Sequence, residues 1–376
     1  MEETRRTFCL KSTLKIGIIG CGGIANGKHM PSLGKLANVE MVAFCDTVVS
    51  RAEEAARDYG VKGARVYDDY RELLEKESLD VVHICTPNSS HAEITIASLE
   101  AGCHVMCEKP MAKTAAEARE MVAAAERTGK KLTIGYQSRF RSDSEYLKKV
   151  CERGDLGEIY LAKARAIRRR AVPTWGVFLD AEKQGGGPLI DIGTHALDLT
   201  LWMMDNYLPK YVVGTVYHKL NKRENAANAW GPWDPKKFQV EDSAFGFIVM
   251  ENGATIVLES SWALNTLLEG EARTILHGTE GGADMEDGLR INGEEFGKLY
   301  TKKPALGTAG VAFYDGKSES EADREARLWI ESIVNDTKPR VLPEQAVVVT
   351  EILEAIYRSA EQGKPVYFKN GRYLSE

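Results

Sequence analysis

The stretch that decides the fold is Leu14–Ala25, with the sequence LKIGIIGCGGIA. A strand-like apolar run leads directly into a glycine-rich turn, which is a GxGxxA form of the dinucleotide-binding fingerprint. In such a turn Gly20 allows a tight bend, Gly22 lets the backbone approach a pyrophosphate, and Ala25 lets the next helix pack closely on the strand. Free N–H groups at the start of that helix then face the phosphates. The stretch therefore predicts a strand, a phosphate-binding turn and a helix.

The alternation of strands and helices continues from Leu14 to Tyr136. Short apolar runs alternate there with charge-rich segments whose apolar residues recur at helical spacing. Helices between successive strands make the strands parallel and the crossovers right-handed. We expect an α/β Rossmann domain with a doubly wound parallel sheet over residues 14–136. Residues 1–13 lack the long apolar stretch of an export signal and are expected to form a tail.

The pattern changes in residues 137–376. Longer strand-like runs follow one another without helices between them, which predicts an α+β substrate-binding domain with a large, mostly antiparallel open sheet. Two helical stretches within 322–364 are expected to return to the Rossmann domain. An open sheet must cover its apolar face, and a second copy of the chain would do so. We expect a homodimer or homotetramer formed through this sheet.

Composition narrows the classes of partner. The formal net charge is −6 and the basic residues are scattered among acids, apart from Arg168–Arg170, which is interpreted as a solvated strand end. Nucleic acid is therefore not an expected partner. No run of about 20 apolar residues occurs, so no membrane partner is expected. The seven cysteines show no CxxC spacing, which favours reduced thiols in a cytoplasmic protein without a metal site.

Several segments are expected at the carboxyl edge of the parallel sheet, where cofactors bind. Asp46 ends the second strand about 20 residues after the glycine turn, as expected for a carboxylate that binds ribose hydroxyls. It favours NAD because it would repel a 2′-phosphate, although Arg51 leaves NADP open. Asn88 is also expected to be a helix N-cap, and His91 to be structural or in contact with the cofactor. The expected cofactor-binding residues are Gly20, Gly22, Gly23, Ile24, Ala25, Asp46, Thr47, Arg51, Thr86, Pro87, Asn88, His91, Glu108, Lys109 and Gln137.

The fifth strand ends in Glu108-Lys109-Pro110, which places charged groups at the same edge. An ammonium there can hydrogen-bond a substrate hydroxyl and lower its pKa, while Glu108 can orient or neutralise the lysine. Alone, these residues are equally consistent with an ordinary strand end.

A second cluster, GGGPLIDIGTHALD, occupies residues 185–198. On the helix expected after Pro188, Asp191 and His195 lie four residues apart on one face. The carboxylate could then set the imidazole tautomer and make His195 a general base. A core histidine beside an acid, or a metal site that uses His195 and Asp198, remains an alternative, the latter weakened by the lack of further ligands.

Taken together, these motifs resemble the Gfo/Idh/MocA family of glucose-fructose oxidoreductases, inositol dehydrogenases and rhizopine-catabolism proteins. GIIGCGGIA, Asp46, TPNSSHAEI, AGCHVMCEKPMA, GYQSRFR and GGGPLIDIGTHALDL occur in the family's order and cover nearly the whole chain. The resemblance implies that Lys109 contacts substrate and nicotinamide, and that Asp191 and His195 complete the catalytic group with His195 as acid/base. It also implies that Gln137 and Arg139 face the cofactor or substrate.

The leading hypothesis is an NAD(P)-dependent oxidoreductase that oxidises a ring hydroxyl of a sugar, glycoside or cyclitol to a ketone. Trp175 is the candidate aromatic wall, whereas Trp230 and Trp233 could close over substrate or a neighbouring subunit, or simply pack in the fold. The alternatives are a redox-assisted glycosidase or lyase that retains NAD, and a non-catalytic NAD-binding regulator. The expected substrate-binding residues are Lys109, Arg139, Trp175, Asp191 and His195.

Overall fold

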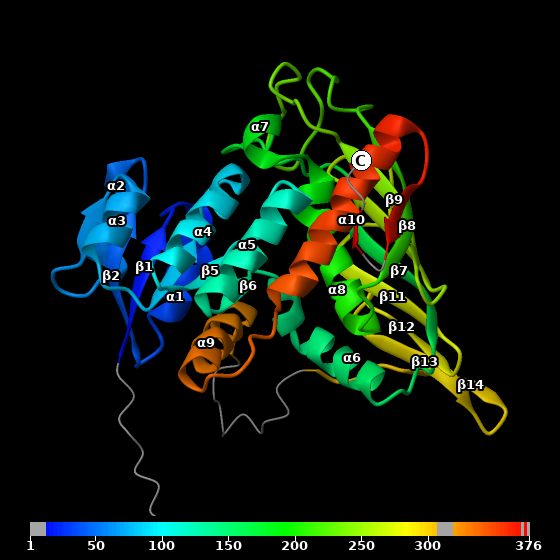
Figure 1. Ribbon diagram of the computed structural model, residues 1–376. Coiled ribbons are helices and arrows are strands. Elements are labelled where there is room, and N and C mark those ends of the chain that lie inside the picture. The colour runs from blue at the N-terminus through cyan, green and yellow to red at the C-terminus, as the bar shows by residue number, and fades with distance from the viewer. Residues whose placement is uncertain (1–12, 307–318, 370–371, 374–376) are drawn as a thin grey trace, which may run out of the picture.

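The computed structural model describes residues 13–306, 319–369 and 372–373 and contains two sheets (Figure 1). The predicted tail, apart from residue 13, lies outside the described residues, as does Cys9. The first sheet is parallel, with the strand order β3-β2-β1-β4-β5-β6. Its strands are β1 Leu14–Ile19, β2 Val39–Cys45, β3 Arg65–Tyr67, β4 Val81–Ile84, β5 His104–Cys107 and β6 Leu132–Ile134.

Helices follow these strands in the doubly wound arrangement that the sequence predicted. The first helical segment contains a π-helical turn, η1 (Ala25–His29), before the short α1 (Met30–Leu33). The longest helix of this part, α5, begins with a capping box in which Thr114 and Glu117 bond each other's backbone N–H. The helices of this part that follow α1 are α2 Val49–Tyr59, α3 Tyr70–Lys76, α4 His91–Glu100 and α5 Ala115–Thr128.

The second sheet has ten strands in the order β14-β13-β12-β11-β7-β10-β9-β8-β15-β16. Within it only β7 and β10 run parallel, so the expected mostly antiparallel sheet and the predicted fold class are confirmed. Its strands are β7 Ile159–Ile167, β8 Pro209–Tyr217, β9 Ser243–Met250, β10 Thr255–Ser261, β11 Gly270–Gly278, β12 Gly281–Asp284, β13 Arg290–Glu295, β14 Lys298–Lys302, β15 Val366–Lys369 and β16 Arg372–Tyr373.

Two helices cover the inner face of this sheet, α8 (Thr194–Met204) and α10 (Pro343–Gln362). Figure 1 shows α10 running between the helices of the first sheet and the face of the second. Close approach of α10 depends on Gly214 in β8, since a Cβ there would lie 2.5 Å from the carbonyl oxygen of Ile356. The helix therefore belongs to the packing of both sheets.

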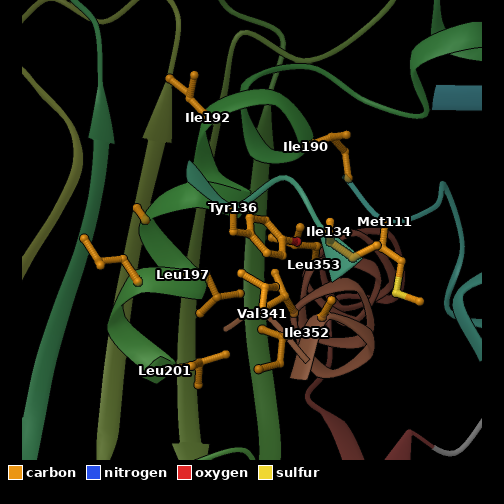
Figure 2. Close-up of a cluster of buried hydrophobic side chains, with 14 of the residues drawn as sticks. Met111, Ile134, Tyr136, Ile190, Ile192, Leu197, Leu201, Val341, Ile352 and Leu353 are labelled. Atoms are coloured by element: carbon orange, nitrogen blue, oxygen red, sulfur yellow. The ribbon is translucent and has the colours of Figure 1, made fainter. Parts of the chain in front are cut away.

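The core between α8, α10 and β6 is one continuous apolar cluster (Figure 2). Tyr136 lies at its centre, fully buried, and its hydroxyl is hydrogen-bonded to Thr194 at 2.9 Å. Burial of side chains of this size contributes roughly 1.5–3 kcal/mol each, which makes relative movement of these elements costly. The labelled members of the cluster are Met111, Ile134, Tyr136, Ile190, Ile192, Leu197, Leu201, Val341, Ile352 and Leu353.

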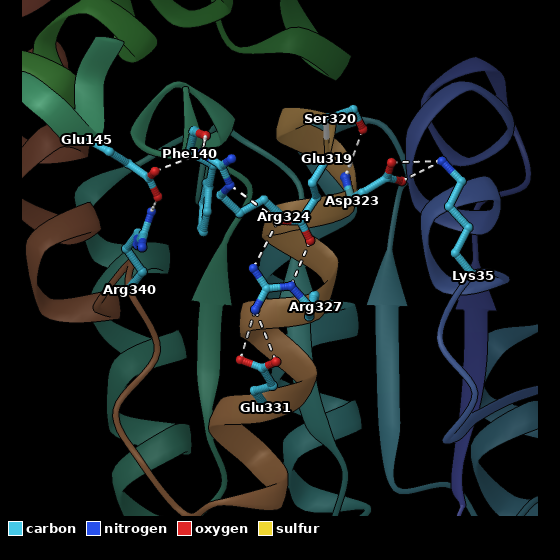
Figure 3. Close-up of polar contacts among 10 residues, drawn as sticks. All are labelled: Lys35, Phe140, Glu145, Glu319, Ser320, Asp323, Arg324, Arg327, Glu331 and Arg340. Atoms are coloured by element: carbon cyan, nitrogen blue, oxygen red, sulfur yellow. Dashed lines mark hydrogen bonds and ion pairs between the residues drawn. The ribbon is translucent and has the colours of Figure 1, made fainter. Parts of the chain in front are cut away.

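Helix α9 (Glu321–Val334) returns to the first sheet and is joined to it by polar contacts (Figure 3). Ser320 caps the helix by accepting the Asp323 N–H, and Asp323 forms an ion pair with Lys35 at 2.7 Å. Arg324 pairs with Glu145 of α6 (Ser142–Glu152) at 2.7 Å. Helix α9 is thus attached by ion pairs to the segment that follows α1 and to α6.

Arg139 is buried in the fold, which does not support the expectation that it contacts cofactor or substrate. Its side chain is fully buried, and its guanidinium donates to both carboxylate oxygens of Asp198, at 2.9 and 2.6 Å. A further bond runs to Gln345 of α10 at 2.7 Å. Arg139 therefore joins the turn after β6 to α8 and α10. The pairing also removes Asp198 from any metal site with His195.

Replacement of Arg139 by Met should destabilise the protein by about 3–5 kcal/mol, because Asp198 would be left as an unpaired buried charge. The free energy of urea unfolding measures this loss. Arg153→Met, which breaks an exposed pair with Asp155, should cost less than about 1 kcal/mol. Affinity for NAD should stay within about twofold in both variants. A large loss of NAD affinity in folded Arg139→Met protein would restore a ligand-contacting role.

Candidate active site

The glycine turn after β1 has an open surface suited to a phosphate group. Gly20 has φ +89°, and a Cβ there would lie 2.6 Å from the carbonyl group of Cys85, so the tight bend requires glycine. At Gly22 and Gly23 a Cβ would meet nothing within 4 Å, which leaves the backbone approachable from outside. Ile24 is partly exposed beside them and Ala25 is buried against the sheet.

Asp46 connects this turn to the end of β2. One carboxylate oxygen accepts the Cys21 N–H at 2.9 Å, and the other accepts the Val48 N–H at 2.8 Å. Each carboxylate oxygen can accept more than one hydrogen bond, so both remain available to ribose hydroxyls. Thr47 and Arg51 are exposed at the start of α2 nearby. The turn and the carboxylate together fit the pyrophosphate and ribose of NAD.

The loop after β4 differs from expectation at Asn88. Its side chain is buried and its amide donates to the carbonyl of Gln184 at 2.8 Å, so it ties this loop to the second half of the chain. The N-cap residue of α4 is Ser90, so the N-cap role expected of Asn88 is wrong. Thr86 is half-buried and its hydroxyl has no hydrogen-bond partner among the described residues, while Pro87 is exposed. Thr86 and Pro87 thus stay candidates for cofactor contact.

Of the two roles expected for His91, structural or in contact with the cofactor, the structure supports the structural one. The residue is fully buried, and its two ring nitrogens face the carbonyl oxygens of Pro110 and Thr86 at 2.8 and 2.9 Å. These contacts connect the loops that follow β4 and β5. His91 supports the edge of the sheet on which the site is built.

Glu108 is held away from the Lys109 ammonium, contrary to expectation. Its Oε1 accepts from the Lys28 ammonium at 2.7 Å and is bonded to His29 Nε2 at 2.8 Å. Although burial disfavours the carboxylate, Lys28 and His29 hold the pKa of Glu108 well below its usual range. Lys109 donates to Glu108 through its backbone N–H, at 3.2 Å, whereas its ammonium is bonded to Asp191. Glu108 supports the strand end instead of neutralising the lysine.

The cluster around Glu108 was missed in the sequence. Lys28 also pairs with Glu325 of α9 at 2.7 Å, and His29 Nδ1 lies 2.9 Å from Nδ1 of His83 in β4. A lysine and a histidine in the apolar segment after the glycine turn were the available signal, because such side chains need buried partners. Their partners lie far away in the sequence, and hydrophobic periodicity gives no information on which distant segments come together.

Lys109 reaches the second domain. Its ammonium donates to the carboxylate and to the carbonyl oxygen of Asp191, both at 2.9 Å. The other carboxylate oxygen of Asp191 accepts from the Trp262 indole N–H at 3.0 Å and lies 3.9 Å from Arg168. Burial opposes ionisation, but Lys109 and Arg168 together lower the pKa of Asp191. Asp191 is therefore an ionised acceptor that positions the lysine.

Trp262 and Arg168 were not predicted as site residues, and Arg168 was interpreted as a solvated strand end. The structure places Arg168 mostly buried at the end of β7, beside Asp191. The strand ends of the second sheet thus contribute to the same site as the first sheet. A basic residue directly after an apolar strand was a signal for a site residue. The direction of the Arg168 side chain could not be predicted, because it depends on the order of strands in the sheet.

The pairing expected between Asp191 and His195 is not a hydrogen bond. The segment Leu189–Gly193 is a π-helical turn, η4, rather than the start of a regular helix, so a four-residue spacing does not align the two side chains. His195 packs edge-on against Tyr136, and its Nδ1 has no partner among the described residues. Burial, and next the Lys109 ammonium, lower the pKa of His195 to about 3. The imidazole is neutral at neutral pH.

The remaining predicted residues lie at the rim or in the core. Trp175 is half-exposed and its ring lies 4.9 Å from that of Trp230. Trp233 is buried and donates to the Asn221 carbonyl at 3.1 Å, so it is a packing residue. Gln137 is half-buried at the start of the 3-10 turn after β6. Across the described ranges, no group of three His, Cys, Asp or Glu side chains could hold a metal ion.

Two family models match the chain. The oxidoreductase family with an NAD-binding Rossmann fold matches residues 14–136, and the Gfo/Idh/MocA C-terminal domain matches residues 144–284. A D-glucoside 3-dehydrogenase of Escherichia coli K12 is 37% identical over 359 residues, which are 94% of this chain and 97% of that protein. The chain belongs to the Gfo/Idh/MocA family.

A second curated relative and a solved structure are also similar, the latter in fold. An inositol 2-dehydrogenase of Salmonella typhimurium is 30% identical over 194 residues, which are 51% of this chain and 55% of that protein. The crystal structure of an oxidoreductase domain protein from Kribbella flavida has a TM-score of 0.81 at 24% identity, with 95% of this chain and 100% of that chain covered. The protein is an NAD-dependent oxidoreductase for sugar-like substrates. No helix among the described residues is long and apolar enough to span a membrane.

The lowered pKa of His195 predicts acid sensitivity of the fold. Between about pH 6.5, the ordinary histidine value, and pH 3, the unfolded chain binds a proton here that the folded protein does not. Stability should thus fall with falling pH in this window, and His195→Asn should reduce the slope by up to about 1.4 kcal/mol per pH unit. Urea unfolding between pH 7 and pH 4.5, at steps on the order of a few tenths of a pH unit, measures the slope of stability against pH for the wild type and for His195→Asn.

His104→Asn is the matched control outside the site. Burial lowers the pKa of His104 to about 4, so this variant should also flatten the slope while turnover stays unchanged. An unchanged slope in His195→Asn would show that folding does not lower the pKa of His195.

Proposed function

We propose that this protein oxidises a secondary ring hydroxyl of a glucoside or related sugar to a ketone with NAD. The proposal is carried by one arrangement: the Lys109 ammonium lies 2.9 Å from Asp191, beside His195, where the carboxyl edge of the parallel sheet meets the second domain. The 37% identity with a D-glucoside 3-dehydrogenase over nearly the whole length of both chains favours a glucoside.

Each residue then has a defined task in the proton transfer. Lys109, held by Asp191, donates a hydrogen bond to the substrate hydroxyl and favours its ionised form. The imidazole of His195 accepts the hydroxyl proton at Nε2, since Nδ1 is buried without a partner among the described residues. Its lowered pKa makes it a weak base, so ionisation of the hydroxyl depends on stabilisation by the Lys109 ammonium. Bound NAD would accept the hydride released from the carbinol C–H bond as the carbonyl forms. The glycine turn and Asp46 are the residues that would hold its pyrophosphate and ribose.

The cofactor site is proposed to be completed by Thr47, Thr86, Pro87 and Gln137. These residues are at least partly accessible, in contrast to buried His91 and Glu108. Asp46 favours NAD over NADP because a 2′-phosphate next to the carboxylate would be repelled. A cytoplasmic location remains a prediction from the cysteine pattern.

A redox-assisted glycosidase or lyase remains the second candidate within the family. Such an enzyme would cleave the substrate and release product without net NADH. Chromatography of the reaction products therefore separates it from a dehydrogenase, which leaves the glycosidic bond intact.

Purified protein with NAD should form NADH from methyl glucosides, and Lys109→Met should reduce kcat/KM by about 10²–10⁴-fold, as expected for loss of a proton-transfer group. Steady-state absorbance of NADH measures the rates, and isothermal titration measures NAD affinity, which should change by less than about threefold. Lys62→Met, an exposed lysine of the same domain, is the control and should behave as wild type.

If Lys109→Met or His195→Asn keeps full turnover, the assigned catalytic group is wrong. If no sugar, glycoside or cyclitol yields either NADH or a cleaved product, the enzyme proposal itself fails and the NAD-binding regulator gains support.

We also propose that the outer face of the second sheet joins copies of the chain. Large apolar side chains are exposed there on the neighbouring strands β9, β8 and β15: Val213, Tyr217, Phe247 and Tyr367. Exposed apolar surface of this kind is typical of interfaces.

Sedimentation equilibrium at micromolar concentration should show a dimer or tetramer. A charge on the face, Phe247→Glu, should weaken association at least about tenfold because it would be buried without a partner. The control Phe296→Glu, on an exposed turn of the β13–β14 hairpin, should leave the mass unchanged. Only monomer in the wild type would contradict the proposal.

A further inference from the structure

Two exposed tryptophans form an aromatic corner beside the site. Trp175 lies in the connection from β7 to α7 (Ala181–Gln184), and Trp230 lies in the connection from β8 to β9. Their rings are 4.9 Å apart at 79°, and the side chains are 51% and 44% exposed. By contrast Trp233 and Trp262 are at most 3% exposed. A pair of half-exposed tryptophans at right angles offers a ring face and a ring edge to one ligand.

The corner is connected to Asp191 on two sides. On one side Trp175 packs against Phe178 at 5.9 Å, Phe178 packs against Trp262 at 6.4 Å, and the Trp262 indole N–H is bonded to Asp191. The contacts therefore form an unbroken path from the exposed corner to the catalytic carboxylate.

On the other side a single residue makes the connection. The Arg168 guanidinium lies over the Trp230 ring at 5.3 Å and 3.9 Å from the carboxylate of Asp191. The two paths meet at Asp191, the residue that holds the Lys109 ammonium. The aromatic corner is thus joined through side-chain contacts to the residues around Lys109 and Asp191.

Hydrogen bonds from side chains and backbone hold the two tryptophan segments together. Asn228 bonds both the N–H and the carbonyl of Val172, at 2.8 and 3.0 Å. The Thr174 hydroxyl donates to the Trp230 carbonyl at 3.0 Å, and the Ala229 N–H donates to the Arg170 carbonyl at 3.0 Å. The corner is therefore preformed, which lowers the entropy cost of binding a ligand there.

The charge at the corner is already balanced. Arg168 donates two bonds to Glu271, at 2.6 and 2.8 Å, so its guanidinium does not offer a free charge to an anion. The two tryptophan rings themselves carry no charge and are the exposed apolar groups of the corner. They suit an uncharged flat ring with an apolar face, such as an aryl group or a second sugar ring.

We propose that Trp175 and Trp230 form a second subsite that binds the non-reacting ring of a glycoside, the ring joined to the sugar that is oxidised. The inference rests on the proposed function, which places the reacting hydroxyl at Lys109 and His195. In that arrangement the ring joined to the oxidised sugar is the part of the substrate that contacts the corner. The subsite makes the enzyme prefer glycosides with a ring aglycone to free sugars and methyl glycosides.

Binding to the NADH complex tests this preference without requiring turnover. Isothermal titration compares methyl β-glucoside with phenyl β-glucoside and cellobiose, whose second rings are aromatic and carbohydrate respectively. The wild type should bind at least one of the ring glycosides about tenfold or more tightly than the methyl glucoside. Which one gains affinity distinguishes an aryl group from a second sugar.

Trp230→Ala should remove most of this difference and leave methyl glucoside affinity within about twofold, whereas Trp230→Phe should retain much of it. Phe296→Ala, which removes an exposed aromatic ring far along the chain in the β13–β14 turn, is the control and should match wild type. If turnover occurs, the same pattern should appear in KM with little change in kcat.

Three results would overturn the subsite. These are equal affinity for all three glucosides in the wild type, equal losses for all three in Trp230→Ala, or a change of oligomer mass in Trp230→Ala that makes the corner a subunit contact. Failure of the proposed function would look different: no compound would be oxidised, while the ring preference in binding would persist.

Discussion

The contact between Lys109 and Asp191 is the constraint on which the site depends. Lys109 follows a strand of the parallel sheet, and Asp191 lies in the π-helical turn that precedes α8 under the second sheet. The Lys109 ammonium makes two hydrogen bonds to Asp191 and so links the first sheet to the second. This link fixes how the carboxyl edge of the parallel sheet faces the segment that contains Asp191. The buried cluster between α8, α10 and β6 keeps that geometry, because any shift of α8 would disturb close-packed side chains.

Behind the lysine lies a second layer of buried charge. Glu108 is ionised and faces Lys28 and His29, away from the site, so Lys109 has Asp191 as its carboxylate partner. Separating the two carboxylates in this way leaves each with its own cation. The lysine therefore remains available to a hydroxyl group while the strand end is rigid.

The sequence was sufficient for the fold class because hydrophobic periodicity is local. Strands and helices between Leu14 and Tyr136, the glycine turn and the change to antiparallel strands all follow from neighbouring residues. The motif residues Lys109, Asp191 and His195 were also found, and the structure brings Lys109 and Asp191 into contact. Their joint role in catalysis remains a prediction.

The failures all concern the direction of side chains. Arg139 and His91 occur in motifs near the carboxyl edge of the parallel sheet, yet both side chains are buried. Arg139 pairs there with Asp198, and the His91 ring faces two backbone carbonyl groups. The π-helical turn changed the relation between Asp191 and His195, since helical spacing assumes regular turns. Arg168 and Trp262 were missed because only strand order brings β7 and β10 beside η4.

The position of α9 has a consequence for the order in which the chain can fold during synthesis. Glu325 completes the charge pairing of Lys28, and Trp329 and Ile330 fill the apolar layer that contains Ile16 and Met30. These residues are made long after the parallel sheet has left the ribosome. The nucleotide-binding half therefore cannot cover this face before α9 has been translated.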